Sequence, residues 1–198
     1  LDVYLPSSVS NGKIILMVHG GAWKIGDKRH DSVITNKVKY FGAKGYTIVS
    51  VNYDLVPSIT VEQQVMEIAQ ALQYVQYHAE NWSADGSKVI LMGHSAGAHL
   101  VSLLSTNKLL YSAKYPILGT VSLDSAVYNL PAIMEKPNHY GFYDDVFGIN
   151  QDYWKKMSPY YQIDQKIKPM YLVCSTLREE SCEQANNFSI KAKSLGSL

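Results

Sequence analysis

The sequence has few cysteines and no excess of either charge, and these shortages exclude several classes of protein. Two cysteines in 198 residues are too few for a disulfide framework. Neither Cys174 nor Cys182 has the histidine partner or repeated spacing of a zinc site, so we expect no metal. The formal net charge is +1 and no basic cluster is present, so we expect no nucleic-acid partner. No apolar run approaches the roughly 20 residues that cross a bilayer, so we expect no membrane span.

The ordinary composition of the chain predicts one globular domain over residues 1–198. Hydrophobic residues make up 46% and charged residues 18%, and no break in composition suggests a second domain. Internal repeats and low-complexity segments are absent. The chain starts at Leu1, inside what reads as a strand, and shows no signal peptide, so a leader could have been removed and the compartment stays open. The oligomeric state is open as well.

The two cysteines allow two interpretations. Cys174 directly follows the apolar run 170–173 and is most simply a core residue, while Cys182 follows the polar loop 178–181. Their spacing also permits a disulfide that closes a small loop at the end of a strand, and such a bond persists mainly outside the cytosol. We favour the interpretation in which Cys174 and Cys182 are not bonded to each other.

Short apolar runs alternate with helical patterns, which predicts an α/β fold. One helix is indicated by apolar residues at three- and four-residue spacing, namely Val61, Val65, Ile68, Ala69, Leu72 and Val75. Alternation of this kind predicts a mostly parallel central sheet with helices on both faces, because a parallel connection must cross over the sheet. Ligands of such sheets bind beyond the carboxyl ends of the strands. The expected strands are 3–5, 14–18, 47–51, 89–92, 119–123 and 170–173.

Residues 93–97 read Gly-His-Ser-Ala-Gly, which is the G-x-S-x-G pattern of a nucleophile elbow. The apolar run 89–92 precedes it and a helical pattern follows, so Ser95 lies where a strand turns sharply into a helix. A strained turn of this kind exposes the serine hydroxyl, and larger side chains at the flanking glycines would collide with the neighbouring strand or helix. The pattern therefore predicts that Ser95 is a nucleophile.

A second motif follows the expected strand 14–18, where residues 19–23 read His-Gly-Gly-Ala-Trp. Glycines allow backbone amides to converge on a small anion, as an oxyanion hole requires. Two parts of one acyl-transfer site thus appear in order, each after its own strand. We expect Gly21, Ala22 and Ala96 to donate these amides.

With these motifs the chain resembles the α/β-hydrolase family, within the carboxylesterase and lipase branch that has an HGG motif. That branch includes esterases similar to hormone-sensitive lipase and the kynurenine formamidases. The resemblance covers nearly the whole chain, from residues 1–6 through the Val-Asn-Tyr at 51–53 to the Ser-Pro at 158–159. One departure is Ala22, which stands where the common motif has a third glycine. The resemblance implies that Gly20 permits the turn, that His19 braces the loop, and that Trp23 lines the pocket or braces the loop.

The resemblance also implies a triad in the order serine, acid, histidine. The acid is expected after the strand 170–173, which leaves Glu179 and Glu180. We favour Glu180 because residues 178–182, Arg-Glu-Glu-Ser-Cys, resemble an Arg-x-acid-Ser-Cys loop of relatives. Asp124 is a third option after the strand 119–123, although capping of the next loop explains it better.

A catalytic histidine is harder to identify. All six histidines lie at or before His139, whereas the resemblance places the base after the final strand, beyond a helix at 183–195. His139 is the one alternative with a plausible route to the site. We expect that the C-terminal part of the fold, with the base, lies beyond Leu198. An aromatic-rich insertion is expected at about 127–165, beside the site, with a short helix at 151–157.

The combined reading is a serine hydrolase that cleaves esters of small or medium organic acids. The predicted reaction passes through a covalent acyl-enzyme intermediate and needs no cofactor. An arylformamidase would use the same groups on an amide bond. A hydrolase-like protein that binds ligands without turnover is the third alternative, because the chain lacks a convincing histidine base.

Overall fold

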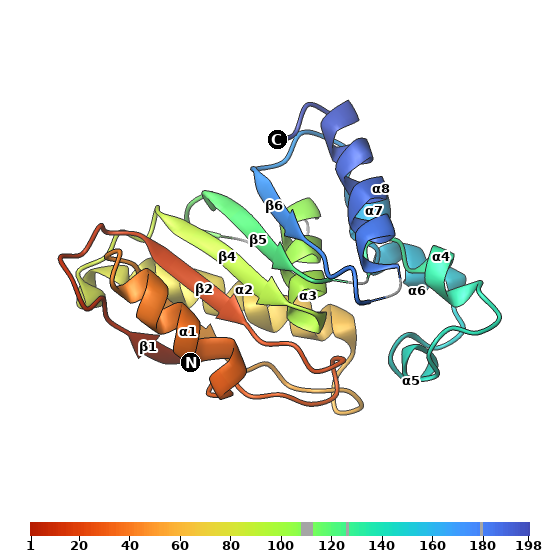
Figure 1. Ribbon diagram of the computed structural model, residues 1–198, viewed down its shortest axis with the longest axis horizontal. Coiled ribbons are helices and arrows are strands. Elements are labelled where there is room, and N and C mark those ends of the chain that lie inside the picture. The colour runs from red at the N-terminus through yellow and green to blue at the C-terminus, as the bar shows by residue number, and fades with distance from the viewer. Residues whose placement is uncertain (108–112, 126, 179) are drawn as a thin grey trace.

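The computed structural model describes residues 1–107, 113–125, 127–178 and 180–198. Within them lies a 6-stranded sheet with the order β1-β3-β2-β4-β5-β6 (Figure 1). Strand β1 pairs antiparallel with β3, and all other pairs are parallel, so the mostly parallel sheet that the sequence predicts is confirmed. The strands are β1 (Asp2–Tyr4), β2 (Ile14–Val18), β3 (Thr47–Val51), β4 (Val89–His94), β5 (Gly119–Leu123) and β6 (Met170–Val173).

The strand bounds follow the apolar runs closely. Strands β2 and β3 are buried at every position, which explains their continuous apolar sequences. The first strand is one residue earlier than expected. Strand β4 continues past the expected residue 92 because its parallel pairing with β5 extends to His94, which lies opposite Leu123.

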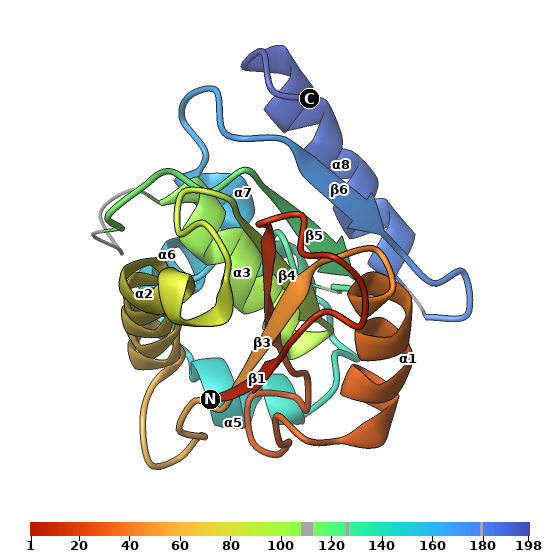
Figure 2. The same cartoon turned by 90° about the vertical axis from the view of Figure 1, so that its left-hand side faces the viewer.

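Helices cover both faces of the sheet (Figure 2). Helix α1 (Asp31–Gly42) packs on one face, while α2 (Val61–His78) and α3 (Ala96–Thr106) pack on the other. Helix α2 begins at a capping box between Thr60 and Gln63 and is followed by the short helix η1 (Ala79–Trp82). The apolar face predicted for α2 is confirmed, since all six of its residues are buried. No helix within the described residues is both long and apolar enough to span a membrane.

Four short helices form the segment 127–165, and most of this segment lies beyond the arrowheads of the strands (Figure 1). Helix α6 begins at residue 151 as expected and ends one residue before the expected 157. Several aromatic rings of this segment are core residues, among them Tyr128 and Trp154. The four helices are α4 (Pro131–Met134), α5 (Phe142–Phe147), α6 (Gln151–Lys156) and α7 (Pro159–Gln162). The last helix, α8 (Ser181–Ser194), contacts α7 and β6 and starts two residues before the expected helix.

Candidate active site

Ser95 occupies a sharp turn between β4 and α3. Its φ of 53° and ψ of −116° lie outside the common regions for a residue with a side chain. The Ser95 N–H donates a hydrogen bond to the carbonyl of Leu123 at 2.8 Å, which fixes the turn against the end of β5. A strained conformation that its surroundings hold in place is typical of functional residues. The turn leaves Ser95 half-buried at the carboxyl edge of the sheet.

The glycines around this turn allow very close backbone packing. A Cβ atom on Gly93 would lie 2.2 Å from the carbonyl oxygen of Gly97. A Cβ atom on Gly97 would lie 2.4 Å from the carbonyl oxygens of Val18 and His19. Larger residues at these positions would therefore collide with the backbone, as the sequence predicts. The close packing that the glycines allow joins the elbow to β2, the strand that leads into the second motif.

We expect Gly97→Ala to lower the free energy of unfolding by about 3 kcal/mol, because the new methyl group meets backbone atoms that cannot rotate away. Gly141→Ala is the matched control, since nothing lies within 4 Å of a Cβ at that position. Its effect is expected to stay within about 0.5 kcal/mol. Urea unfolding of both variants measures the difference, and equal midpoints would contradict the packing described for Gly97.

The second motif forms a loop with three consecutive positive φ angles after β2. These are 122° at Gly21, 49° at Ala22 and 60° at Trp23. A Cβ atom on Gly21 would lie 1.9 Å from the carbonyl oxygen of Ile25, so this position requires glycine. Within the described chain, the amides of Ala22 and Ala96 donate no hydrogen bond to a protein acceptor. Such unpaired donors suit an oxyanion.

The two motifs meet at a small hollow of about 30 Å³, called here the Ser95 hollow. A larger cavity of about 840 Å³ adjoins it and shares three of its lining residues, Phe142, Tyr143 and Arg178. The segment 127–165 therefore supplies part of the wall beside Ser95. Besides Ser95 itself, the hollow is lined by Ala22, Trp23, Ala96, Phe142, Tyr143 and Arg178, among others.

His19 braces the loop rather than facing the hollow. Its ring stacks on Tyr53 with centroids 4.5 Å apart, and its Nδ1 makes a hydrogen bond of 2.7 Å with the carbonyl of Gly20. The Tyr53 hydroxyl donates to the His19 carbonyl at 2.9 Å. Burial lowers the pKa of His19, which favours the neutral ring. Gly20 packs against the elbow, because a Cβ there would lie 2.7 Å from the His94 carbonyl oxygen.

Trp23 is held by a buried hydrogen-bond chain that the sequence analysis did not identify. Its Nε1–H donates to His99 Nδ1 at 3.1 Å. His99 Nε2 therefore carries the ring proton and donates to the carbonyl of Met157 at 2.7 Å. The chain joins the oxyanion loop, α3 and the segment 127–165, so Trp23 both lines the hollow and braces the loop. The signal in the sequence was the position of His99 on an otherwise apolar helix face.

Burial lowers the pKa of His99 to about 4 from the ordinary 6.5. Below pH 6.5 the unfolded chain takes up a proton at this residue, whereas the folded protein does not until about pH 4. The stabilisation is thus complete above pH 6.5 and falls as the pH drops through this window, by about 1.4 kcal/mol per pH unit. Urea unfolding between pH 7 and 4 is expected to show a shallower loss for His99→Gln than for the wild type. If the two proteins lost stability equally with falling pH, the buried neutral state assigned to His99 would be contradicted. His19, whose pKa burial also lowers, is present in both proteins and does not affect the difference.

Glu180 is the residue just before α8, has a φ of 67° and lines the larger cavity. Its Oε1 accepts a hydrogen bond from Lys136 Nζ at 2.6 Å, which makes an ion pair with a residue just after α4. The favoured acid therefore follows β6 at the carboxyl edge of the sheet, where its described partner is Lys136. The alternative Glu179 lies outside the described residues.

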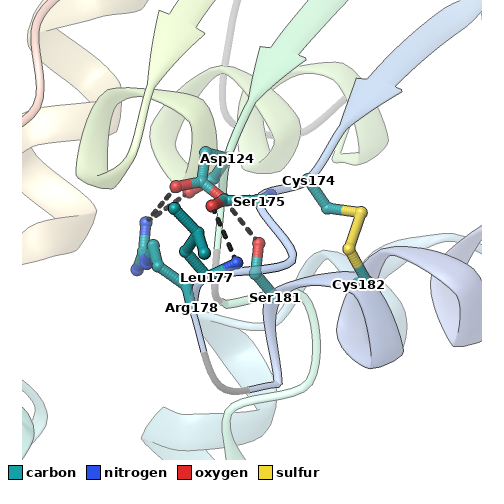
Figure 3. The surroundings of a disulfide bond; sticks show 7 residues. All are labelled: Asp124, Cys174, Ser175, Leu177, Arg178, Ser181 and Cys182. Atoms are coloured by element: carbon teal, nitrogen blue, oxygen red, sulfur yellow. Dashed lines mark hydrogen bonds and ion pairs between the residues drawn. A yellow bond between two sulfur atoms is a disulfide. The ribbon is translucent and has the colours of Figure 1, made fainter.

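Asp124 follows β5 and holds the loop between β6 and α8 (Figure 3). Its Oδ1 accepts hydrogen bonds from Ser175 N at 2.8 Å and Ser181 Oγ at 2.7 Å, and its Oδ2 pairs with Arg178 Nη1 at 3.1 Å. Burial by itself raises the pKa of this carboxyl, but the Ser181, Ser175 and Arg178 donors outweigh it and hold the pKa below its ordinary value. These contacts indicate that Asp124 caps a loop. The loop is the one after β6, whereas the sequence suggested the one after β5.

Cys174 and Cys182 form a disulfide, so the favoured prediction of unpaired cysteines is wrong (Figure 3). The end of β6 and the first turn of α8 bring their Cα atoms to 5.0 Å. Sequence spacing alone does not reveal this approach. The bond closes the loop that carries Arg178 and Glu180, next to the hydrogen bonds around Asp124.

The described histidines make contacts away from the Ser95 hydroxyl. His139 Nδ1 contacts the carbonyl of Lys136 at 2.8 Å and its Nε2 contacts Asp144 at 3.0 Å. These two contacts raise the pKa of His139. Within the described residues no hydrogen bond joins a histidine ring to Ser95 Oγ.

Comparison with known proteins agrees with this geometry. The chain is 31% identical over 136 residues to a kynurenine formamidase of Salmo salar, an alignment that covers 68% of this chain and 44% of that protein. It is 28% identical over 163 residues to an arylesterase of Saccharolobus solfataricus, covering 79% and 50% respectively. The chain thus spans about half the length of these curated relatives.

Solved esterase structures share the fold. Esterase B from Lactobacillus rhamnosis superimposes with a TM-score of 0.81 at 17% identity, over 98% of this chain and 67% of that chain. The apo form of Thermogutta terrifontis esterase 2 gives a TM-score of 0.73 at 19% identity, over 98% and 74%. The BD-FAE family matches residues 1–180. With the elbow, the glycine-rich loop and the sheet in place, this match shows that the chain belongs to the BD-FAE family of α/β-hydrolases.

Proposed function

We propose that this protein is a serine carboxylesterase that cleaves esters of small or medium organic acids. One observation carries the proposal. Ser95, on a turn with positive φ, lines the same hollow as Ala22 and Ala96, whose amides have no protein acceptor within the described chain. A nucleophile and unpaired amide donors on one hollow are the requirements of acyl transfer.

In the proposed reaction Ser95 Oγ attacks the ester carbonyl carbon and its proton passes to a histidine base. The amides of Gly21, Ala22 and Ala96 stabilise the negative charge on the carbonyl oxygen. Collapse of this intermediate breaks the bond to the alcohol, which takes the proton from the histidine. Water then attacks the acyl carbon and passes a proton to the histidine, and collapse of the second intermediate releases the acid as Ser95 Oγ takes that proton back. Each oxyanion donor contributes about 3 kcal/mol to lowering the barrier.

Glu180 is proposed as the acid that orients the base, because it follows β6 at the edge of the sheet where Ser95 lies. In this fold the order along the chain is serine, acid, histidine. Asp124 is the weaker candidate, since its carboxylate oxygens already accept hydrogen bonds from Ser175, Ser181 and Arg178.

Arylformamidase activity is the second candidate, and the similarity to a kynurenine formamidase favours it. The same nucleophile and amides would act on a formyl amide. Trp23, Phe142 and Tyr143 supply an aromatic wall that suits an aryl group as well as an ester.

Two measurements test the proposal. A fluorophosphonate probe is expected to label the protein at Ser95, as located by peptide mass spectrometry. Steady-state rates on p-nitrophenyl butyrate and on an aryl formamide are expected to show a higher kcat/KM for the ester. A higher value for the formamide would favour the second candidate. Absence of both labelling and turnover would favour a hydrolase-like binding protein without catalysis.

A further inference from the structure

Arg178 brings a positive charge to a hollow that is otherwise uncharged. Of the described residues that line the Ser95 hollow, Arg178 alone carries a charge, and the others are apolar, aromatic or hydroxyl-bearing. The same side chain lines the larger adjoining cavity. A substrate that places its ester at Ser95 therefore meets a guanidinium group close to the reacting bond, although Asp124 pairs with one side of that group.

The guanidinium group is fixed by contacts on one side. Arg178 Nη1 donates to the Asp124 carbonyl oxygen at 2.6 Å and to Asp124 Oδ2 at 3.1 Å. Asp124 is itself held by Ser175 and Ser181, within the loop that the disulfide closes (Figure 3). A side chain held in this way loses little further freedom when it binds a ligand.

The opposite edge of Arg178 has no partner within the described chain. Arginine has five N–H donors, and the two bonds to Asp124 use those of Nη1. The Nε and Nη2 donors form no hydrogen bond with any described residue. These two nitrogens lie on one edge of the planar group, and that edge binds a carboxylate through two parallel hydrogen bonds.

The neighbouring charges do not occupy this edge. Lys136 and Glu180, which both line the adjoining cavity, pair with each other at 2.6 Å. Asp124 accepts a hydrogen bond from Arg178 only at Nη1. Its other carboxylate oxygen accepts hydrogen bonds from Ser175 and Ser181. The Nε and Nη2 groups of Arg178 are thus a pair of charged donors beside Ser95 that no described residue occupies.

We propose that Arg178 is a specificity-determining residue that binds a carboxylate of the ester substrate. The inference rests on the proposed esterase function and adds a substrate class to it. That class is esters with a carboxylate near the scissile bond, such as monoesters of dicarboxylic acids or acyl esters of hydroxy acids.

Matched ester pairs test the proposal in the full chain. One pair is methyl hydrogen glutarate and methyl hexanoate, and the other is acetoxyacetate and propyl acetate, so that the carboxylate lies on the acyl part or on the alcohol part. In at least one pair the wild type is expected to favour the charged ester by about tenfold or more in kcat/KM. Arg178→Gln is expected to remove this preference, lowering kcat/KM at least about tenfold for the charged ester and less than about threefold for the uncharged one.

Arg178→Lys and Arg29→Gln are the control variants. Lysine keeps the charge without the planar edge, so a partial loss is expected. Arg29 pairs with Asp2 away from the Ser95 hollow, and its removal is expected to leave both rates unchanged.

Equal losses for both esters in Arg178→Gln would overturn the proposal, because they would show that Arg178 only holds the loop. No preference for a charged ester in either pair would overturn it as well. If the wild type hydrolyses no ester at all, the proposed function fails by itself. Calorimetric binding of the same esters to Ser95→Ala, with and without Arg178→Gln, then tests the carboxylate site separately, and absence of a charged-ester preference there would overturn it.

Discussion

Ser95→Ala is expected to lower kcat for ester hydrolysis by at least about 10⁴-fold. The hydroxyl is the proposed nucleophile, and no other described serine combines a positive φ before a helix with a place in the same hollow as Ala22 and Ala96. The oxyanion donors and the substrate contacts remain in the variant, so a small residual rate above the uncatalysed reaction is expected. KM is expected to change little, because the hydroxyl contributes mainly in the transition state.

Initial rates on p-nitrophenyl butyrate, together with fluorophosphonate labelling, measure this effect. Ser58→Ala is the matched control, since Ser58 is an exposed residue on the loop before α2. The control is expected to keep wild-type rates and labelling. Retained turnover in Ser95→Ala would show that the nucleophile has been assigned to the wrong residue.

Glu180→Gln is expected to lower kcat by about 10²- to 10⁴-fold with little change in KM. The proposed carboxylate stabilises the positive charge that forms on the histidine base during the reaction, and an amide cannot do so. In the structure Glu180 pairs with Lys136. Lys136→Met is expected to keep kcat within about threefold, because an exposed ion pair of this kind contributes little energy to the site.

Asp124→Asn separates the two acid candidates. Asparagine keeps an acceptor oxygen for Ser175 and Ser181 but loses the charge that pairs with Arg178. We expect a smaller fall in kcat than for Glu180→Gln, accompanied by a lower unfolding midpoint. The reverse order of the two kcat losses would assign the acid to Asp124, and normal rates in both variants would leave neither residue as the acid.

Secondary structure was largely predictable from local patterns. The strands β2, β3, β5 and β6 have the expected bounds because each is a short apolar run that the sheet buries or pairs along its whole length. Helix α2 could be predicted because its buried face repeats with helical spacing. Helix α8 was placed two residues late, since it begins at the disulfide-bonded end of the loop rather than at a residue typical of a cap.

The residues that hold the site in place were less predictable. His99 reads as one more residue of a helix after the elbow, and only packing shows that it accepts a hydrogen bond from Trp23 and donates one to Met157. Asp124 and Arg178 are separated by 54 positions, and their ion pair depends on β5 lying beside β6. Contacts of this kind depend on distances between elements, which local sequence does not encode.

The amino-acid sequence by itself predicted the α/β class, the bounds of most strands and the two motifs of an acyl-transfer site, because the apolar runs and the glycine-containing motifs are local signals. Only the tertiary structure decided which groups meet. It brought Ala22 and Ala96 to one hollow with Ser95, joined Cys174 to Cys182, and directed Asp124 to the loop that carries Arg178 and Glu180. The physical reason is that parallel strands end at one edge of the sheet, so loops distant in the chain become neighbours there.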